Sequence, residues 1–123
     1  MNGIEYDTSE KGLRTILKDY QEIALNAIWA SKEGLNSRQV WVAVNEKLKP
    51  ATISRASIIN FLEAMREMGV LKGVEVTGKG GHRWIYSTGM NESGFKVFIA
   101  ETVLGNLMRG FPKETRGAIE KLS

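Results

Sequence analysis

Residues 54–86 read SRASIINFLEAMREMGVLKGVEVTGKGGHRWIY, and the spacing of their apolar residues changes part-way along. At first these residues recur at steps of three and four, as on one face of a helix: Ile58, Phe61, Leu62, Met65 and Met68. From 74 to 86 they alternate with polar residues around a run of glycines, which is typical of two strands and a turn. The stretch therefore predicts a helix over 54–68 and a β-hairpin with a glycine-rich, basic tip.

The residues before this stretch predict further helices. Apolar residues keep helical spacing over 12–31, but Asp19 followed by Glu22 is typical of a capping box. The segment is therefore either one helix or a short helix followed by a second from Tyr20. Asn36 with Gln39 three positions on predicts a capped helix over 37–48, after a stop at Gly34. Pro50 then breaks the chain, and either Thr52 or Ser54 caps the helix over 54–68.

Two more helices are expected after the hairpin. Asn91 is expected to cap a helix that reaches about Arg109, and Pro112 suits the first position of a last helix over 113–122. The first of these is very apolar for a helix outside a three-helix core, so a partner subunit is its natural cover. The alternative is that it folds back on the first helix of its own chain. The residues expected at the dimer interface are Phe95, Phe98, Ile99, Thr102, Val103 and Met108.

This order of elements predicts an α+β fold that is mostly α. Three helices followed by a hairpin are the order of a winged helix-turn-helix, in which the third helix is presented outward and the hairpin wing lies beside it. We expect this DNA-binding domain over residues 1–89, with a three-helix core and a two-stranded β wing. Residues 90–123 are then expected to form C-terminal dimerisation helices.

Composition excludes several classes of protein. The chain has 123 residues, of which 42% are hydrophobic and 25% charged, so it has enough apolar material for a core. Without Cys and with one His, it cannot form a disulfide scaffold or an ordinary structural zinc site, and we expect no metal and no cofactor. It has no phosphate-binding glycine loop or zinc-protease motif, so we expect no enzyme activity. Without a long apolar run or a signal-like start, it is expected to be soluble and cytoplasmic.

Charge is unevenly distributed along the chain. The formal net charge is +3, but residues 36–86 contain eight basic and four acidic side chains, an excess of four positive charges. Residues 1–35 instead have an acidic excess of two. A basic middle suits an anionic partner such as nucleic acid, and the alternative is an ordinary mixed surface.

Five short segments follow one another in an order that resembles a known family. They are Ile28-Trp29, Ser54-Arg55-Ala56-Ser57-Ile58, Met68-Gly69-Val70-Leu71, Trp84-Ile85-Tyr86 and Asn91-Glu92-Ser93. From about Leu17 to Phe95 the chain resembles the penicillinase-repressor (BlaI/MecI-type) family of winged-helix transcription regulators. The resemblance implies a homodimer that binds a palindromic operator with its third helices and represses transcription.

The third helix is the candidate reading element. Its first turns are expected to expose Arg55, Ala56, Ser57 and Asn60. In a major groove, Arg can form paired hydrogen bonds with guanine, and Asn can do so with adenine. The loop before the helix and the wing are expected to hold phosphates, which fix register without reading sequence. The candidate DNA-binding residues are Lys49, Thr52, Ser54, Arg55, Ser57, Asn60, Lys79, His82 and Arg83. The alternative is that they are ordinary surface residues.

Other conspicuous side chains have structural explanations. The aromatic residues of the helices and hairpin are expected to pack in the core rather than to stack on bases: Trp29, Trp41, Trp84 and Tyr86. Glu63 and Glu67 are one helical turn apart and are expected to form a solvated helix face.

The sequence thus predicts a sequence-specific double-stranded DNA-binding transcription regulator, a homodimeric repressor of a palindromic operator. The alternative is a winged-helix protein–protein interaction module without DNA binding. Salt dependence distinguishes the two, because counterion release makes DNA affinity fall steeply with ionic strength. The sequence indicates no membrane partner and names no small-molecule effector.

Overall fold

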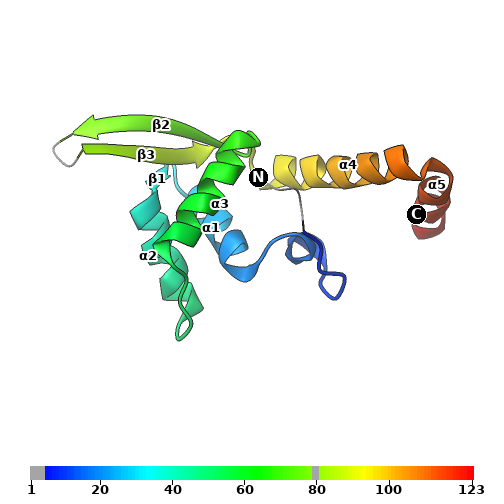
Figure 1. Cartoon of the computed structure of the whole chain (residues 1–123), viewed down its shortest axis with the longest axis horizontal. Coiled ribbons are helices and arrows are strands. Elements are labelled where there is room, and N and C mark those ends of the chain that lie inside the picture. Colours follow the sequence, from blue (N-terminus) through cyan, green and yellow to red (C-terminus); the bar gives the residue numbers. More distant parts are fainter. Residues whose placement is uncertain (1–4, 79–80) are drawn as a thin grey trace. The chain divides into compact units, whose positions relative to one another are not determined.

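The structure is a computed structural model of the chain and describes residues 5–78 and 81–123, with only the backbone at His82. In these residues it contains five α-helices, a 3-10 turn and a three-stranded antiparallel sheet (Figure 1). The fold is therefore α+β and mostly helical, as predicted. It divides into two compact units, one that runs to Glu92 and one over Ser93–Ser123.

The open question about residues 12–31 has a definite answer. They form a short 3-10 helix, η1 (Gly12–Thr15), and a separate helix, α1 (Asp19–Ala30). The predicted capping box of Asp19 and Glu22 is wrong by one residue. Gln21 Oε1 instead accepts a hydrogen bond of 2.9 Å from the backbone N–H of Lys18, so the helix begins at Asp19.

Capping side chains fix the next two helices. α2 (Ser37–Leu48) begins as predicted, with Asn36 and Gln39 exchanging hydrogen bonds of 2.8 Å between side chain and backbone. α3 (Arg55–Glu67) is capped by Ser54, whose Oγ accepts the backbone N–H of Ser57 at 3.1 Å. Of the two alternatives for this start, Ser54 is therefore the cap.

The sheet contains the predicted hairpin and one strand that the sequence did not reveal. The hairpin is β2 (Leu71–Gly78) paired with β3 (Gly81–Thr88), and a two-residue strand, β1 (Leu35–Asn36), pairs with the other edge of β3. Gly34 precedes β1 with φ 84°, and a Cβ there would lie 2.7 Å from the carbonyl oxygen of Tyr86. A glycine is required at this position because β1 approaches β3 so closely.

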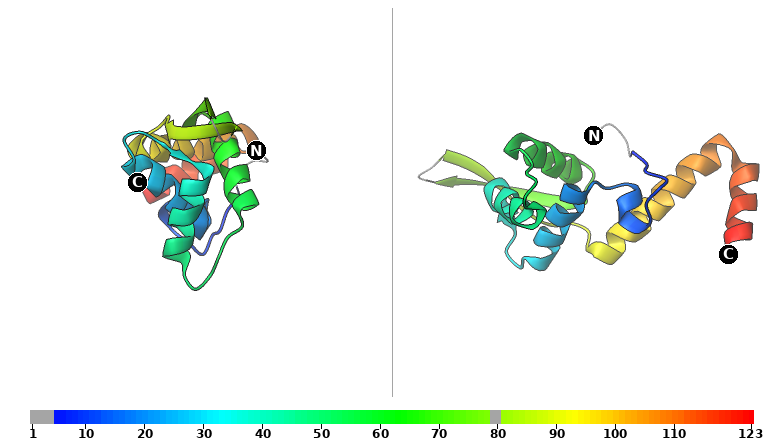
Figure 2. Two further views of the ribbon diagram at one scale, coloured as in Figure 1. Left: turned by 90° about the vertical axis from the view of Figure 1, so that its left-hand side faces the viewer. Right: turned by 90° about the horizontal axis from the view of Figure 1, so that it is seen from below.

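The core of the first unit lies between the three helices and the base of the hairpin. It is built from Ala24, Leu25, Ile28, Val40, Val44, Ile58, Phe61, Leu62, Met65, Val70, Leu71 and Tyr86, all buried. Full burial of one such Leu or Ile contributes about 1.5–3 kcal/mol relative to exposure. The hairpin extends past the helices of this unit, as Figure 1 and the right-hand view of Figure 2 show. Its outer part therefore stands away from the core.

The second unit consists of α4 (Glu92–Gly110), whose first residue lies at the unit boundary, and α5 (Pro112–Leu122). Pro112 occupies the first turn of α5, as predicted, and the hydroxyl of Thr115 donates to the carbonyl of Phe111 at 2.7 Å. None of the described helices is both long enough and apolar enough to cross a membrane.

Candidate nucleic-acid interface

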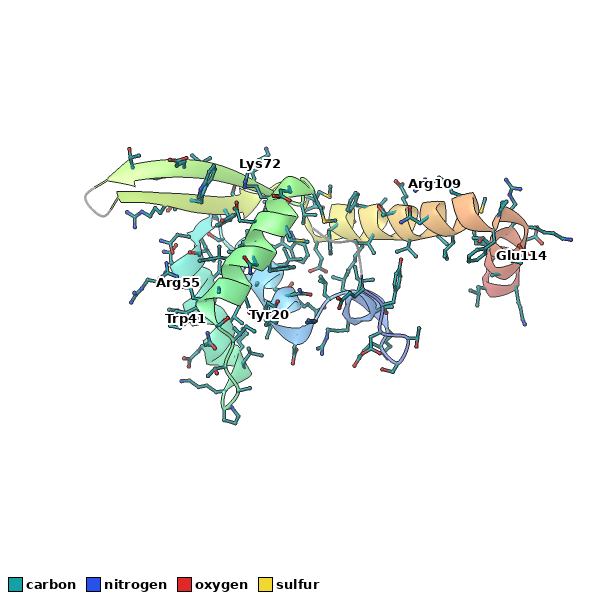
Figure 3. All side chains as sticks on the ribbon, in the orientation of Figure 1. Tyr20, Trp41, Arg55, Lys72, Arg109 and Glu114 are labelled. Carbon is teal, nitrogen blue, oxygen red and sulfur yellow. The ribbon has the colours of Figure 1, made fainter. Side chains whose placement is uncertain are left out.

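The first half of α3 presents polar side chains on a rigid support. Arg55, Ala56 and Asn60 are exposed, as predicted, whereas Ser57, which was expected to be exposed with them, is half-buried. The other side of the helix is fixed by burial in the core: Ile58, Phe61, Leu62 and Met65. The Arg55 side chain projects from the first turn (Figure 3). Ile59 is 37% exposed on the same side, so this surface also offers an apolar contact of the kind a thymine methyl group accepts.

Arg55 is held only loosely. Its Nη2 donates one long hydrogen bond of 3.5 Å to the hydroxyl of Ser37 in α2. A bond of that length is weak, so the guanidinium can turn toward another acceptor at small cost. Ser54 and Ser57 are more constrained, because their hydroxyls are bonded to each other at 2.9 Å within the helix cap. Arg55 is therefore freer than either serine to turn toward an acceptor outside the chain.

The loop before α3 is anchored by side chains of α2. Asn45 Oδ1 accepts the backbone N–H of Ile53 at 2.8 Å, and Trp41 Nε1 donates to the Ile53 carbonyl at 3.0 Å. These bonds hold the start of α3 while Thr52 stays exposed. Lys49 is also exposed, but its ammonium pairs with Glu46 at 3.1 Å, so contact with a phosphate would require it to leave that carboxylate.

The hairpin supplies one described basic candidate. Arg83 is exposed on β3, where it pairs across the ladder with Val76. Lys79 and the side chain of His82 lie outside the described residues. Val74 and Val76 on β2 are exposed as well, at 59% and 36%. The outer hairpin thus combines a cationic side chain with apolar ones.

Glu63 corrects one expectation from the sequence. It is not part of a solvated face: its carboxylate accepts hydrogen bonds from Arg66 at 2.9 and 3.2 Å and from the hydroxyl of Tyr86 at 2.7 Å. These bonds, first those from Arg66 and then that from Tyr86, hold the pKa of Glu63 below its ordinary value. Burial, followed by the bond to Glu63, raises the pKa of the Tyr86 hydroxyl. Glu67 is exposed, as expected.

The aromatic residues are only partly in the core. Tyr86 is buried, whereas Trp29, Trp41 and Trp84 are half-buried. Trp29 Nε1 donates to the Met90 carbonyl at 2.8 Å, as Trp41 Nε1 does to that of Ile53. Indoles bonded in this way to backbone carbonyls are structural anchors rather than a stacking surface for bases.

A cavity of about 860 Å³ is lined by residues of the 5–21 segment and by one side of α3. Ser57 and Asn60 line it, and Glu5, Asp7 and Glu10 line it from the other segment. Arg55 and Ala56 do not line this cavity. Arg14 and Lys18 also line it, so Asn60 lies on a cavity with charged side chains of both signs, whereas Arg55 lies outside it.

The residues expected at a dimer interface differ in exposure. Phe95 is 1% exposed in the single chain and so has no surface left for a partner to cover, whereas the other five are half-buried: Phe98, Ile99, Thr102, Val103 and Met108. Further apolar side chains of α4 and the turn after it are exposed: Val97, Leu104, Leu107 and Phe111. Figure 3 shows Arg109 and Glu114 on the two helices of this unit.

In the described part of the chain, no group of three or more His, Cys, Asp or Glu side chains is placed to hold a metal ion. No protein-family model and no curated protein matches the chain. Among solved structures, it is similar to the ferric uptake regulator Fur of Helicobacter pylori, whose structure reveals three functional metal-binding sites.

The two chains are 19% identical over 58% of this one, with a TM-score of 0.47. The matched part is 46% of the Fur chain, so this chain spans less than half of that protein. A likeness of this degree carries no argument about ligand or function.

Proposed function

We propose that the chain is a sequence-specific double-stranded DNA-binding transcription regulator, acting in the cytoplasm as a homodimeric repressor of the penicillinase-repressor type. The observation that carries the proposal is the first half of α3, where Arg55 and Asn60 are exposed on a helix whose opposite side is core. The major groove, about 12 Å wide, accepts a helix presented in this way. The exposed Arg83 on the adjacent hairpin supports a second contact, to phosphate.

The candidate residues divide by role. Arg55, with Asn60 and Ser57, reads base edges, while Lys49, Thr52, Ser54 and the wing residues Lys79, His82 and Arg83 hold phosphates. Each well-made bidentate base contact is worth about 1–3 kcal/mol of discrimination. The anchored start of α3 supports this division, because it fixes the reading side chains relative to the loop.

Residues 90–123 are proposed to dimerise the DNA-binding domain of residues 1–89. A unit of two helices that leaves Val97, Leu104 and Leu107 exposed has apolar surface for a second copy to cover, next to the half-buried Phe98 and Val103. A twofold dimer matches a palindromic site whose half-sites lie about one helical turn, or a multiple of it, apart.

Fluorescence anisotropy tests the proposal. A labelled duplex from the region upstream of the protein's own gene is titrated beside a scrambled duplex of equal composition, at two salt concentrations, with the dimer mass checked by light scattering. We expect tighter binding to the upstream duplex and a steep loss of both affinities with salt. Absence of binding to either duplex at low salt would contradict the proposal.

The exposed valines of β2 favour a second candidate, a protein-interaction module. Val74 is 59% exposed on an edge strand, where a partner could dock by apolar contact. Apolar interfaces respond little to salt, so the titration above separates the two functions. Salt-independent capture of a partner protein, with no binding to DNA, is the result that this candidate predicts.

A further inference from the structure

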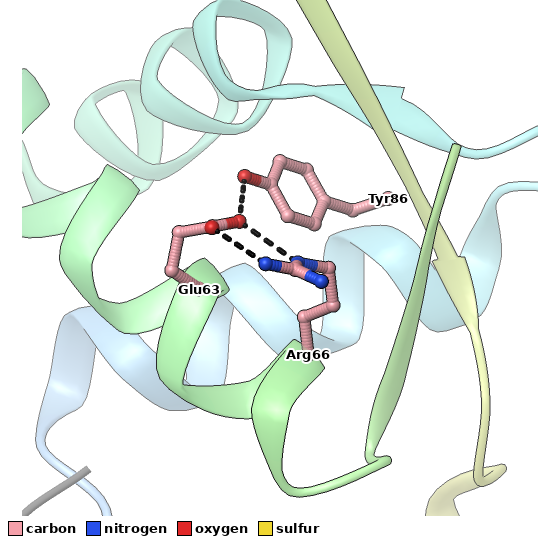
Figure 4. Close-up of polar contacts among 3 residues, drawn as sticks. All are labelled: Glu63, Arg66 and Tyr86. Carbon is pink, nitrogen blue, oxygen red and sulfur yellow. Dashed lines mark hydrogen bonds and ion pairs between the residues drawn. The ribbon is translucent and has the colours of Figure 1, made fainter. Parts of the chain in front are cut away.

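Three polar side chains connect the second half of α3 to the hairpin (Figure 4). Glu63 Oε1 accepts from Arg66 Nη2 at 2.9 Å, and Glu63 Oε2 accepts from Arg66 Nε at 3.2 Å. The same Oε2 accepts from the hydroxyl of Tyr86 at 2.7 Å. Glu63 and Arg66 belong to α3 and Tyr86 to β3, so one carboxylate joins the two elements. Bonds to a charged acceptor are stronger than neutral ones.

Arg66 also contacts both strands of the hairpin, although a third of its side chain stays exposed. Its guanidinium carbon lies 4.8 Å from the ring centroid of Trp84, a cation–π contact. A Cβ on Gly73 would collide with Arg66 Cδ, so the arginine stem lies directly against the backbone of β2. Gly73 faces Tyr86 in the ladder. The arginine is thus held by a carboxylate, an indole ring and a strand at once.

Beyond the Glu75↔Trp84 pair, the hairpin is largely exposed. Three more residue pairs follow Trp84 toward the tip, from Val76↔Arg83 to Gly78↔Gly81. Along β2 the residues of these pairs are all exposed, and Arg83 on β3 is exposed too. At about 3.3 Å per residue, Arg83 lies about 10 Å along β3 from Tyr86, so a tilt of about 10° at Tyr86 moves the backbone at Arg83 by about 2 Å. A hydrogen bond to phosphate tolerates a few tenths of an ångström.

We propose that Glu63, Arg66 and Tyr86 are positioning residues, which set the angle between the hairpin and α3 so that Arg83 reaches a phosphate while α3 occupies the groove. This role rests on the proposed DNA binding. The positioning role goes beyond stability. In this role, the contribution of Arg83 to DNA affinity depends on the Tyr86 hydroxyl, which does not itself contact DNA. Both elements of a bipartite DNA contact must be in register at the same time, and this cluster is a polar connection between them.

A double-mutant cycle on DNA affinity tests the role. Arg83→Ala, Tyr86→Phe and the double variant are titrated by anisotropy against the upstream duplex, on which α3 is proposed to occupy the groove. In the otherwise unchanged protein we expect Arg83→Ala to weaken binding about three- to tenfold and to lower the salt slope by about one. In the Tyr86→Phe background we expect less than a twofold further loss, because the contact is already out of register. Such non-additivity measures coupling between the two residues.

Controls separate positioning from folding. Tyr20→Phe removes a hydroxyl from a second tyrosine of the same unit, one that is half-buried, and its cycle with Arg83→Ala is expected to be additive. Glu63→Gln provides a second route, since it keeps an acceptor for Tyr86 but loses the charge that holds Arg66. Circular dichroism melts verify that every variant is folded at the titration temperature.

The outcomes are distinct. Additive effects of Arg83→Ala and Tyr86→Phe would overturn the positioning role and leave the proposed function intact. An Arg83→Ala variant that binds like the unchanged protein would overturn it too, because the wing would not touch DNA. If the unchanged protein binds no duplex, the proposed function fails, and the positioning role fails with it.

Discussion

The two halves of α3 carry similar polar side chains but use them differently. In the first half, Arg55 has one long hydrogen bond of 3.5 Å. In the second half, Arg66 makes two shorter bonds to Glu63 and stacks on Trp84. Residue type does not separate these arginines, whereas their partners within the fold do. The side chains left without strong internal partners are the ones available to a ligand, and those with several partners hold the elements together.

The largest expected effect comes from the core between the two halves. Leu62 is fully buried, so Leu62→Ala should lower the free energy of unfolding by about 2–5 kcal/mol. Its exposed neighbour provides the control, since Ile59→Ala should change that free energy by about 0.5 kcal/mol or less. Urea denaturation followed by circular dichroism measures both. Equal losses would mean that α3 does not have a buried and an exposed side.

The next effect is on DNA affinity and leaves the stability of the fold almost unchanged. Arg55→Ala should cost about 1–3 kcal/mol on the preferred duplex and relax the preference at one base pair. Its free energy of unfolding should change little, because only the long bond to Ser37 is lost. Anisotropy on duplexes with single base-pair changes measures the preference. Equal weakening on preferred and scrambled duplexes would show that Arg55 contacts phosphate alone.

A smaller effect is expected at the cluster itself. Tyr86→Phe removes the hydroxyl that donates to Glu63 at 2.7 Å and should lower the free energy of unfolding by about 1 kcal/mol. Tyr20→Phe should cost less, because the Tyr20 hydroxyl takes part only in a weak bond of 3.4 Å from Gln21. Thermal melts of the two variants compare the contributions of the two hydroxyls to stability. A larger loss for Tyr20→Phe would contradict the assigned role of the cluster.

The smallest effect is a dependence on pH. The folded state lowers the pKa of Glu63 below its ordinary 4.5, so the carboxylate stabilises the fold above that pH. That stabilisation is lost as pH falls through the lower, folded pKa, and it is modest because Glu63 is about one-third exposed. The difference in melting temperature between the unchanged protein and Glu63→Gln should therefore shrink on acidification below 4.5. A difference in melting temperature that grows below pH 4.5 would contradict this prediction.

Local signals explain what the sequence predicted. Asn36 and Gln39 cap α2 through bonds within four residues, and the change of period at 68–74 marks the hairpin. Both depend on neighbours in the chain. The exposed start of α3 was predicted for the same reason, since the apolar residues on its other side fix which side faces out.

Features that depend on distant segments were missed. β1 has only two residues, too few to show alternation, and its pairing with Tyr86 depends on where the hairpin packs. Glu63 and Tyr86 are 23 residues apart, so their bond follows from the register of the hairpin. One sequence signal for the cluster exists in retrospect: Glu63 and Arg66 are spaced for a helical ion pair.

The central claim is that the first half of α3 and the outer hairpin face DNA, while the second half of α3 serves the fold. Nuclear magnetic resonance titration of the isotope-labelled protein with the upstream duplex tests it residue by residue. We predict amide shift changes at residues 52–60 and 76–83, with little change at 63–68 and over α5. Shift changes confined to α4 and α5, or absent at Arg55, would contradict the account.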